Sequence, residues 1–182
     1  GKIGIPNGIM GIFPSEGKVT FNGNDIPLND PAQSLKSKIA FVSEDRRGVG
    51  LLLGCSIEEN IVLTAVQIQN KYLKNYGILT QLDKKLIRSH ALDMISNLDI
   101  RCTGPDQLTR RLSGGNQQKV CIARALTLDP EIIFVSEPTR GIDIGAKKLV
   151  LDTLVELNKR LGMTVVVISS ELAELRSVCD RI

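Results

Sequence analysis

Two neighbouring segments constrain the fold of this chain more than any other part of its sequence. Residues 112–120 (LSGGNQQKV) place a glycine pair at the start of a helical stretch, and residues 132–137 (IIFVSE) form an apolar run that ends in a carboxylate. A helix N-terminus that begins with Ser-Gly-Gly presents backbone N–H groups and a hydroxyl, which suit a phosphate. A carboxylate at the C-terminal end of a parallel strand lies where ligands bind in open α/β sheets. The two segments therefore predict an α/β domain with a phosphate-binding patch.

Strands and helices alternate through the second half of the chain, and this order predicts a parallel sheet with right-handed crossovers. Apolar runs predict three strands, at 38–42, 131–136 and 164–169. Helical periodicity predicts helices at 114–127 and 145–160 and a short one from 171 onward. The inward face expected for the 145–160 helix consists of Leu149, Val150, Leu154 and Leu157. Residues 18–22 alternate ahead of a turn at 23–25, which predicts an antiparallel hairpin at an edge.

Residues 56–112 are expected to be mostly helical. The sequence Ser-Ile-Glu-Glu at 56–59 is a capping box, which predicts a helix that continues to about Val66. A second helix is predicted at 83–99, where apolar residues recur on one helical stripe: Leu86, Ile87, Ala91, Met94, Ile95 and Leu98. The charged residues 43–48 are predicted to form a loop after the first parallel strand.

Composition excludes several classes of function. A net charge of +3 is mild, aromatic residues make up 3% and Trp is absent, so nucleic acid is not expected as a partner. No apolar stretch reaches the roughly 18–20 residues of a membrane span, and no signal peptide is visible. Any association with a membrane is therefore expected to come through a partner.

The remaining sequence features favour structural roles. The four cysteines have no CxxC spacing and are expected to be unpaired thiols in a reducing compartment. His90, the single histidine, lies among apolar residues of a predicted helix, where a structural role is expected rather than metal ligation. The chain starts at Gly1 without Met and stops directly after a helix, so we expect one domain over 1–182 that is truncated at both ends.

Five ordered segments resemble the motifs of ATP-binding-cassette (ABC) ATPases. They correspond to the Q-loop region, signature, Walker B strand with catalytic glutamate, D-loop and switch: 43–48 (SEDRRG), 112–120, 132–137, 138–143 (PTRGID) and 168–172 (ISSEL). In detail they are most similar to the second ATPase half of tandem sugar importers that serve ribose, galactose or xylose, with nucleoside importers close by. The resemblance covers nearly the whole chain. It implies a P-loop NTPase-like α/β fold with a mostly parallel sheet, a small antiparallel β edge and a helical subdomain at about 56–112.

The resemblance also implies roles for individual residues. Contacts to ATP are implied for Gly1, Lys2, Ile3, Ser113, Gly114, Gly115, Gln117 and Asp143, and catalytic roles for Glu137, Glu44 and Ser170. In the family, the signature patch faces a nucleotide held by the other ATPase half. Asp143 is expected to reach across that interface, to cap the following helix, or to do both. Glu137 would polarise the attacking water, although a carboxylate saturated by backbone N–H groups stays open as the alternative.

Several positions depart from the family pattern around the chain's own nucleotide. Ser136 stands where an aspartate would bind Mg²⁺, and Ile3 stands where a hydroxyl would bind it. Glu44 replaces the Q-loop glutamine and Ser170 replaces the switch histidine, as in the second half of the sugar importers. We therefore expect weak nucleotide and Mg²⁺ binding and poor hydrolysis at this site, with Ser136 as the remaining candidate metal contact. An ordinary Gly-Lys at a frayed terminus stays open for Gly1 and Lys2.

Two pairs of basic residues lie near these motifs. Arg46 and Arg47 would bind phosphate or a partner loop, or else form a solvated charge run. Lys147 and Lys148 are expected on a solvated helix face.

Pro6 and Gly8 fall where the family has a helix, in which Pro is tolerated only in the first turn and Gly costs roughly 1 kcal/mol.

The resemblance implies an importer ATPase half at the cytoplasmic face of the cell membrane. Its partners would be a second ATPase half arranged head to tail, membrane permease subunits and, indirectly, a solute-binding protein. The alternatives are a pairing or regulatory module without hydrolysis, a nucleoside importer ATPase, and a soluble ABC protein of translation or DNA repair. The absence of a long coiled-coil insertion and of a basic arm disfavours the last of these.

Overall fold

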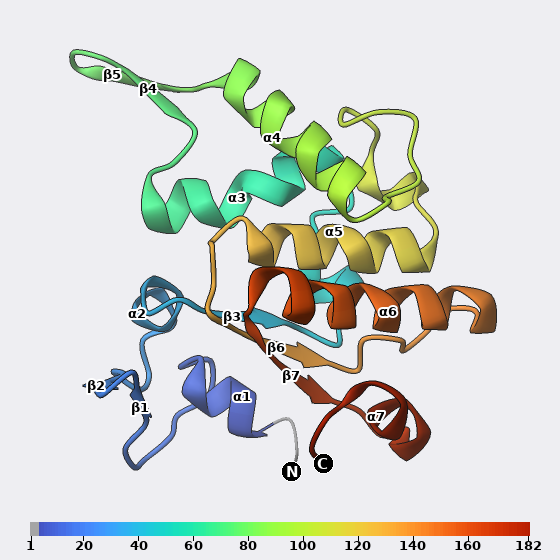
Figure 1. Ribbon diagram of the computed structural model, residues 1–182. Coiled ribbons are helices and arrows are strands. Elements are labelled where there is room, and N and C mark those ends of the chain that lie inside the picture. Colours follow the sequence, from blue (N-terminus) through green and yellow to red (C-terminus); the bar gives the residue numbers. More distant parts are fainter. Residues whose placement is uncertain (1–3) are drawn as a thin grey trace.

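A three-stranded parallel sheet organises the part of the chain that the computed structural model describes, residues 4–182 (Figure 1). The strands are β3 (Ile39–Val42), β6 (Ile132–Ser136) and β7 (Thr164–Ile168), in the order β3-β6-β7. Ala40 lies opposite Ile133, and Ser136 lies opposite Ile168. The predicted strands and their parallel arrangement are confirmed.

The central strand β6 is packed on both of its faces. Its sequence, IIFVS, is rich in β-branched and aromatic residues, which suit a pleated, buried surface. Ile133 and Val135 are 0% exposed and belong to the large core, whereas Phe134 belongs to a smaller cluster with Met10 and Ile26 on the other face. This burial fixes the register of β6, because a shift by one residue would exchange the two sets of side chains.

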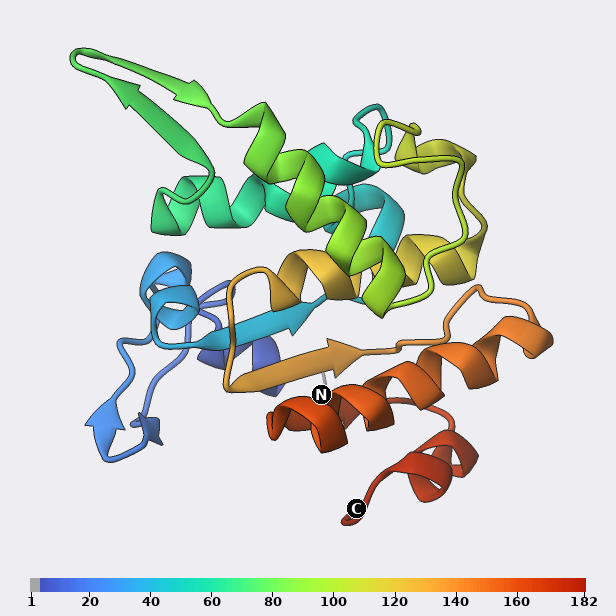
Figure 2. The same ribbon diagram turned by 45° about the horizontal axis from the view of Figure 1, so that its top comes forward.

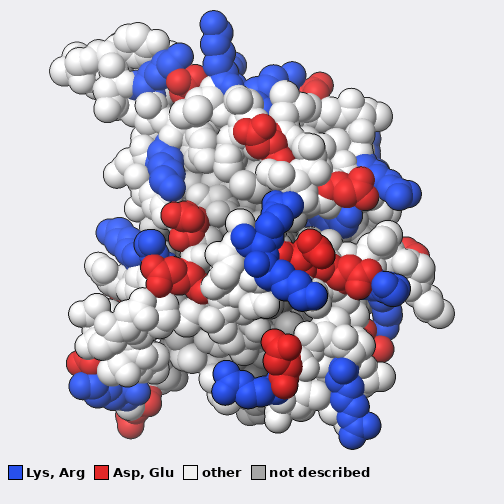
Figure 3. Space-filling model, in the orientation of Figure 1, with Lys and Arg blue, Asp and Glu red and all other residues white. Residues whose placement is uncertain are grey.

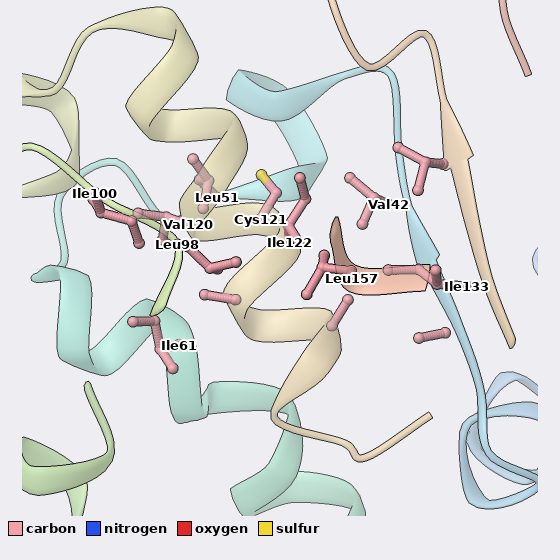
Figure 4. Packing of buried hydrophobic residues seen from close by; sticks show 14 of the residues in the cluster. Val42, Leu51, Ile61, Leu98, Ile100, Val120, Cys121, Ile122, Ile133 and Leu157 are labelled. Carbon is pink, nitrogen blue, oxygen red and sulfur yellow. The ribbon is translucent and has the colours of Figure 1, made fainter. Parts of the chain in front are cut away.

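Helices cover both faces of the sheet. The helices α5 (Gly114–Leu126) and α6 (Ile144–Leu161) lie on one face, and the short α1 (Gly4–Ile9) lies on the other (Figure 1). Figure 4 shows Ile122 of α5 and Leu157 of α6 in one cluster with Val42 and Ile133 of the sheet. Both long helices were predicted, and α5 contacts the sheet at β3 as well as the helices α3 and α6.

A second helical layer lies over α5 on the side away from the sheet (Figure 1). It consists of α3 (Ile57–Gln69) and α4 (Lys84–Asn97). The predicted capping box is present, because Ser56 Oγ accepts from the backbone N of Glu59 at 3.2 Å and Glu59 Oε2 accepts from the backbone N of Ser56 at 2.7 Å. Both predicted helices of this region are confirmed.

Between α3 and α4 the chain forms a hairpin that the sequence analysis did not predict. Strands β4 (Leu73–Tyr76) and β5 (Leu79–Leu82) pair antiparallel and extend as an arm away from the helical layer (Figures 1 and 2). Gly77 makes the turn with φ of 67°, a conformation that glycine adopts without strain. The expectation of a mostly helical 56–112 is therefore wrong for this segment, where a turn glycine interrupts two extended runs.

Short elements complete the described chain. They are β1 (Thr20–Phe21), β2 (Asn24–Asp25), α2 (Pro31–Lys36), the π-helical turn η1 (Arg46–Gly50), the 3-10 turn η2 (Thr109–Arg111) and α7 (Leu172–Val178). The pairing of β1 with β2 confirms an antiparallel hairpin, although residues 24–25, predicted as part of the turn, form β2 and the pair is a sheet of its own. α7 confirms the short helix after the last strand. η1 takes the place of the second half of the predicted charged loop, residues 46–48. α2 follows from its cap, since Asp30 accepts from the backbone N of Ala32 and Gln33.

Two leucines that were assigned to inward helix faces lie at the surface. Leu86 of α4 is 50% exposed and Leu149 of α6 is 48% exposed. The buried stripe of each helix is narrower than predicted, with Ile87 and Val150 at its centre. An apolar residue at the margin of such a stripe stays in contact with water.

His90 makes packing contacts inside the helical layer. Its ring centroid lies 5.2 Å from that of Tyr72, and its Nε2 lies 2.9 Å from Thr127 Oγ1. The Thr127 hydroxyl donates to the carbonyl O of Ala123 at 2.8 Å, so the imidazole donates from Nε2. Burial lowers the pKa of His90.

The cysteines within the described chain are all unpaired, and burial raises the pKa of the Cys121 thiol to about 12. Within residues 4–182, no helix combines the length and the hydropathy that crossing a bilayer requires.

A buried polar network joins the helical layer to α5. The Asn60 side chain is completely buried and bonds both the backbone N and O of Leu52, each at 2.9 Å, and Thr109 Oγ1 at 2.9 Å. Arg124 of α5 donates to the carbonyl O of Asn60 and of Gly50, each at 2.7 Å. These bonds give the buried Asn60 amide and the partly buried Arg124 guanidinium hydrogen-bond partners within the chain.

Asn60→Ala should lower the free energy of unfolding by about 3 kcal/mol, because it removes the side-chain bonds of Asn60 to Leu52, to Thr109 and to the Arg124 guanidinium. Chemical denaturation of the purified chain measures the change. Asn97→Ala, at an exposed position of α4, is the matched control and should change stability by less than about 0.5 kcal/mol. Equal effects of the two substitutions would contradict the role given to the network.

Stability should fall as the pH is lowered from 7 to about 5.5, through the unfolded pKa of histidine near 6.5. The pKa of His90 is lowered in the folded state, so the unfolded chain takes up the proton first as the pH falls. This protonation stabilises the unfolded state and lowers the free energy of unfolding. Because His90 is the single histidine, His90→Gln should flatten this part of the profile. Thermal melting across the pH range tests it, and an unchanged slope in the variant would show that another group titrates.

Candidate functional site

The C-terminal ends of the three parallel strands bring the candidate catalytic side chains to one edge of the sheet. Glu44 follows β3, Glu137 follows β6 and Ser170 follows β7. Ser170 Oγ donates to Glu137 Oε2 at 3.0 Å. Glu44 Oε2 lies 3.6 Å from Arg140 Nη1. The structure thus places Glu137 and Ser170 in contact and connects Glu44 to the turn that begins at Glu137.

Glu137 has an unusual backbone conformation for a glutamate. Its φ is 45°, in the left-handed region that non-glycine residues rarely adopt. The surrounding bonds hold it there, because its backbone N donates to the carbonyl O of Ile168 at 2.7 Å and its carbonyl accepts from the N of Arg140 at 3.1 Å. Residues held in such conformations concentrate at functional sites.

A hollow of about 360 Å³ opens beside this carboxylate. The residues around it come from the turn after β6, from α6 and from the segment after β7: Glu137, Thr139, Arg140, Gly141, Lys147, Ser170 and Glu171. A second hollow of about 520 Å³, lined by residues 44–47, shares Arg140 and Gly141 with it. Cationic and carboxylate groups therefore face the same space, which suits an anionic ligand and a polarised water.

Lys147 belongs to this hollow and not to a solvated helix face, so the expectation for it is wrong. Its Nζ lies 2.6 Å from Glu171 Oε1 and 3.5 Å from Glu174 Oε1. The hydrogen bond to Glu171 raises the pKa of Lys147. Lys148 is exposed and pairs with Asp152 at 2.8 Å, as expected for the outer face of α6.

Glu174 holds the turn after β6 against the end of β7. It is 8% exposed and accepts hydrogen bonds from Thr139 Oγ1 and, at 3.0 Å, from Ser169 Oγ. The sequence analysis did not single out Glu174. Its signal was a lone acidic residue on the first turn of a short amphipathic helix.

Arg46 fixes the other side of the same turn. It is 7% exposed, and its guanidinium donates to the carbonyl O of Arg140 at 2.8 Å and of Gly141 at 3.4 Å. The interpretation of Arg46 as part of a solvated charge run is therefore wrong. Arg47 is exposed, as the same interpretation expects. The loop that Arg46 binds belongs to its own chain. Burial lowers the pKa of Arg46.

The residues predicted to bind phosphate lie at the start of α5. Ser113 is the N-cap and is exposed, with its Oγ accepting from Asn116 Nδ2 at 2.9 Å. A Cβ on Gly114 would come within 3.2 Å of the carbonyl O of Gly141, a tight contact that a side chain here could make only if that carbonyl shifted. The lining of the hollow beside Glu137 does not include Ser113, Gly114 or Gly115.

Gln117 and Asp143 have structural partners within the chain. Gln117 is 3% exposed and its Nε2 donates to the carbonyl O of Thr109 at 3.3 Å, so it points into the interior and not toward the exposed patch. Asp143 is the N-cap of α6, where its Oδ1 accepts from the backbone N of Ala146 at 3.0 Å.

The residues near Ser136 are poorly suited to Mg²⁺. Ser136 is 0% exposed and its Oγ has no hydrogen-bond partner among the described residues. Within residues 4–182 no group of three His, Cys, Asp or Glu side chains is arranged to hold a metal. Mg²⁺ prefers hard oxygen ligands in octahedral geometry, commonly with a carboxylate, and a sealed neutral hydroxyl supplies neither charge nor access. Gly1, Lys2 and Ile3 lie outside the described residues.

Solved structures with the same fold are ATP-binding cassettes. A nucleotide-free cassette from an ABC transporter superposes with a TM-score of 0.77 at 22% identity, covering 99% of this chain and 70% of that one. A dimeric bacterial ABC transporter cassette superposes with a TM-score of 0.72 at 28% identity, covering 97% of this chain and 72% of that one. The fold expected from the motifs is confirmed.

Curated relatives extend the likeness to sugar importers. The chain is 37% identical over its full length to the ribose import ATP-binding protein RbsA of Caldanaerobacter subterraneus subsp. tengcongensis, and covers 36% of that protein. It is 38% identical over 96% of its length to the xylose import ATP-binding protein XylG of Escherichia coli, and covers 33% of that protein. The chain thus spans about a third of the relatives it matches.

The family model for ABC transporters matches residues 1–140, which include the signature and the carboxylate after β6. Because the family model, the relatives and the fold agree, this chain belongs to the ABC transporter family and is an ATP-binding cassette of the ATPase type.

Proposed function

We propose that this chain acts as one nucleotide-binding domain of an importer that couples ATP binding and hydrolysis to the uptake of a sugar. The support is that relatives matched along the whole chain are named for ribose and xylose import. In such an assembly the domain would lie at the cytoplasmic face of the membrane against permease subunits. A solute-binding protein would deliver the sugar to those subunits.

The two functional parts of the cassette serve different nucleotides in this proposal. The exposed Ser113 and the glycines after it complete the site of a second ATPase half arranged head to tail. The observation that carries this is their position at the start of α5, outside the lining of the hollow beside Glu137. Gln117, which is buried, acts by holding the helix and not by touching ATP.

The chain's own nucleotide is bound weakly and hydrolysed slowly. Ser136 supplies a sealed hydroxyl where a charged ligand for Mg²⁺ is needed. Glu137, Ser170, Arg140 and Lys147 still surround a space in which ATP phosphate and water would fit. The chain's residues would then orient a water through Glu137 and balance phosphate charge through the two cations.

The orphaned Ser136 hydroxyl also favours a second candidate function, a pairing module that completes its partner's site and hydrolyses nothing itself. A nucleoside importer is the alternative with respect to substrate. Titration of the purified chain with labelled ATP distinguishes the pairing module from an ATPase, because turnover at micromolar ATP requires an autonomous enzyme. Uptake assays with sugars and nucleosides distinguish a sugar importer from a nucleoside importer.

In the assembled transporter, Ser113→Arg should lower steady-state ATP hydrolysis by on the order of 100-fold, because it blocks a patch that binds phosphate for the partner half. Glu137→Gln, at the weak site, should leave most of the turnover. Ser89→Arg, at an exposed position of α4, controls for the added charge and bulk. Loss of turnover in Glu137→Gln with full turnover in Ser113→Arg would overturn the proposed division of roles.

ATP binding to the purified chain should be nearly the same with Mg²⁺ and with EDTA. Ser136→Asp should make binding Mg²⁺-dependent, with a gain of about tenfold when the metal is present. Ser136→Asn has a similar size and no charge, and should show no such gain. Isothermal titration with thermal melts of each variant measures this, and strong Mg²⁺ dependence of the unsubstituted chain would contradict the weak-site proposal.

A further inference from the structure

The hairpin between α3 and α4 carries an apolar tip that no part of the described chain covers. Ile78 is 100% exposed, Tyr76 and Leu79 are each 61% exposed and Leu82 is 51% exposed. A two-stranded hairpin standing alone in water is marginally stable. The β4–β5 register is nevertheless well defined, with Thr80 Oγ1 donating to Asn75 Oδ1 across the strands at 2.9 Å.

The base of the same hairpin concentrates positive charge. Residues 70–87 contain four lysines and one acid, so this segment carries +3, which equals the net charge of the whole chain. Lys74 is paired with Asp83 at 3.2 Å. Within residues 4–182, no ion pair involves Lys71, Lys84 or Lys85. Figure 3 shows the arm at the upper left, uncharged toward its end, with blue Lys or Arg atoms and red Asp or Glu atoms side by side at its base.

We propose that this hairpin docks on an anionic lipid surface, with Tyr76, Ile78 and Leu79 entering the interfacial layer and Lys71, Lys84 and Lys85 contacting headgroups. An apolar tip with a cationic base is the combination that binds anionic membranes. Tyrosine is also favoured at this depth, because its ring is apolar and its hydroxyl is wet. Lys71, Lys84 and Lys85 at the base of the hairpin have no ion-pair partner among the described residues, and its apolar tip is exposed on all sides. Both features favour a lipid surface over a protein groove.

This inference goes beyond the proposed function, because it gives the cassette a direct contact with lipid that needs neither permease subunits nor nucleotide. The hairpin projects from the helical layer and contributes no residue to the hollow beside Glu137. Loss of lipid binding would therefore leave ATP binding intact, and the two proposals fail separately.

A single tryptophan provides the direct test, since the chain contains none. In the full chain with Ile78→Trp, fluorescence should shift to shorter wavelength on mixing with phosphatidylcholine vesicles that contain phosphatidylglycerol, and should not shift with pure phosphatidylcholine. Ile144→Trp is the matched control, because Ile144 is 88% exposed at the start of α6 and far from the hairpin in sequence. Its emission should stay unchanged with both kinds of vesicle.

Co-sedimentation then measures the contribution of charge. The double variant Lys84→Glu/Lys85→Glu should lower partitioning onto the anionic vesicles at least about tenfold, and high salt should do the same to the unsubstituted chain. Lys159→Glu/Arg160→Glu, at the exposed end of α6, should leave partitioning nearly unchanged. Equal losses in both double variants would overturn the proposal. An equal fluorescence shift of Ile78→Trp with pure phosphatidylcholine and with the anionic vesicles would overturn it as well. Hairpin variants that bind vesicles normally but fail to assemble with permease subunits would assign the arm to a protein partner instead.

Discussion

The guanidinium of Arg124 is the contact on which the layered arrangement depends. It extends from α5, the helix that packs against the sheet, and donates to the carbonyl O of Asn60 and of Gly50. Those two carbonyls belong to the helical layer and to the turn after β3, so one partly buried cation joins three parts of the chain. Asn60 completes the junction by bonding both backbone groups of Leu52. Apolar packing alone would let the layers slide, whereas directional bonds in a dry interior permit one arrangement.

The turn after β6 is restrained from two sides in a comparable way. Arg46 binds two of its carbonyls from the β3 side, and Glu174 binds Thr139 from the β7 side. The turn therefore cannot move without breaking bonds to the segments that follow both neighbouring strands, η1 and α7. Because Gly114 packs against the carbonyl of Gly141, the start of α5 is part of the same unit. The exposed patch and the carboxylate edge are thus mechanically connected although they line different spaces.

Sequence periodicity predicted the parallel sheet and the long helices because apolar side chains repeat at the spacing of the surface they bury. It failed where the decisive interactions are polar and non-local. Arg46 looks like a surface cation beside Arg47, and only the distant carbonyls of residues 140 and 141 make its burial favourable. Lys147 was misjudged for the same reason, since its carboxylate partners lie on a later helix. The β4–β5 hairpin was missed because it buries almost nothing, and a segment without a buried face carries little periodic signal.

The left-handed backbone at Glu137 has a consequence for how this domain would respond to selection. Glycine or asparagine would adopt that φ more easily, and the gain in stability for glycine would be of order 1 kcal/mol. Either replacement would also remove the carboxylate from the edge of the sheet. Selection for thermal resistance alone would therefore favour loss of the acidic group, and selection for hydrolysis would oppose it. At position 137, the stability of the fold therefore favours glycine or asparagine, whereas hydrolysis requires the carboxylate of glutamate.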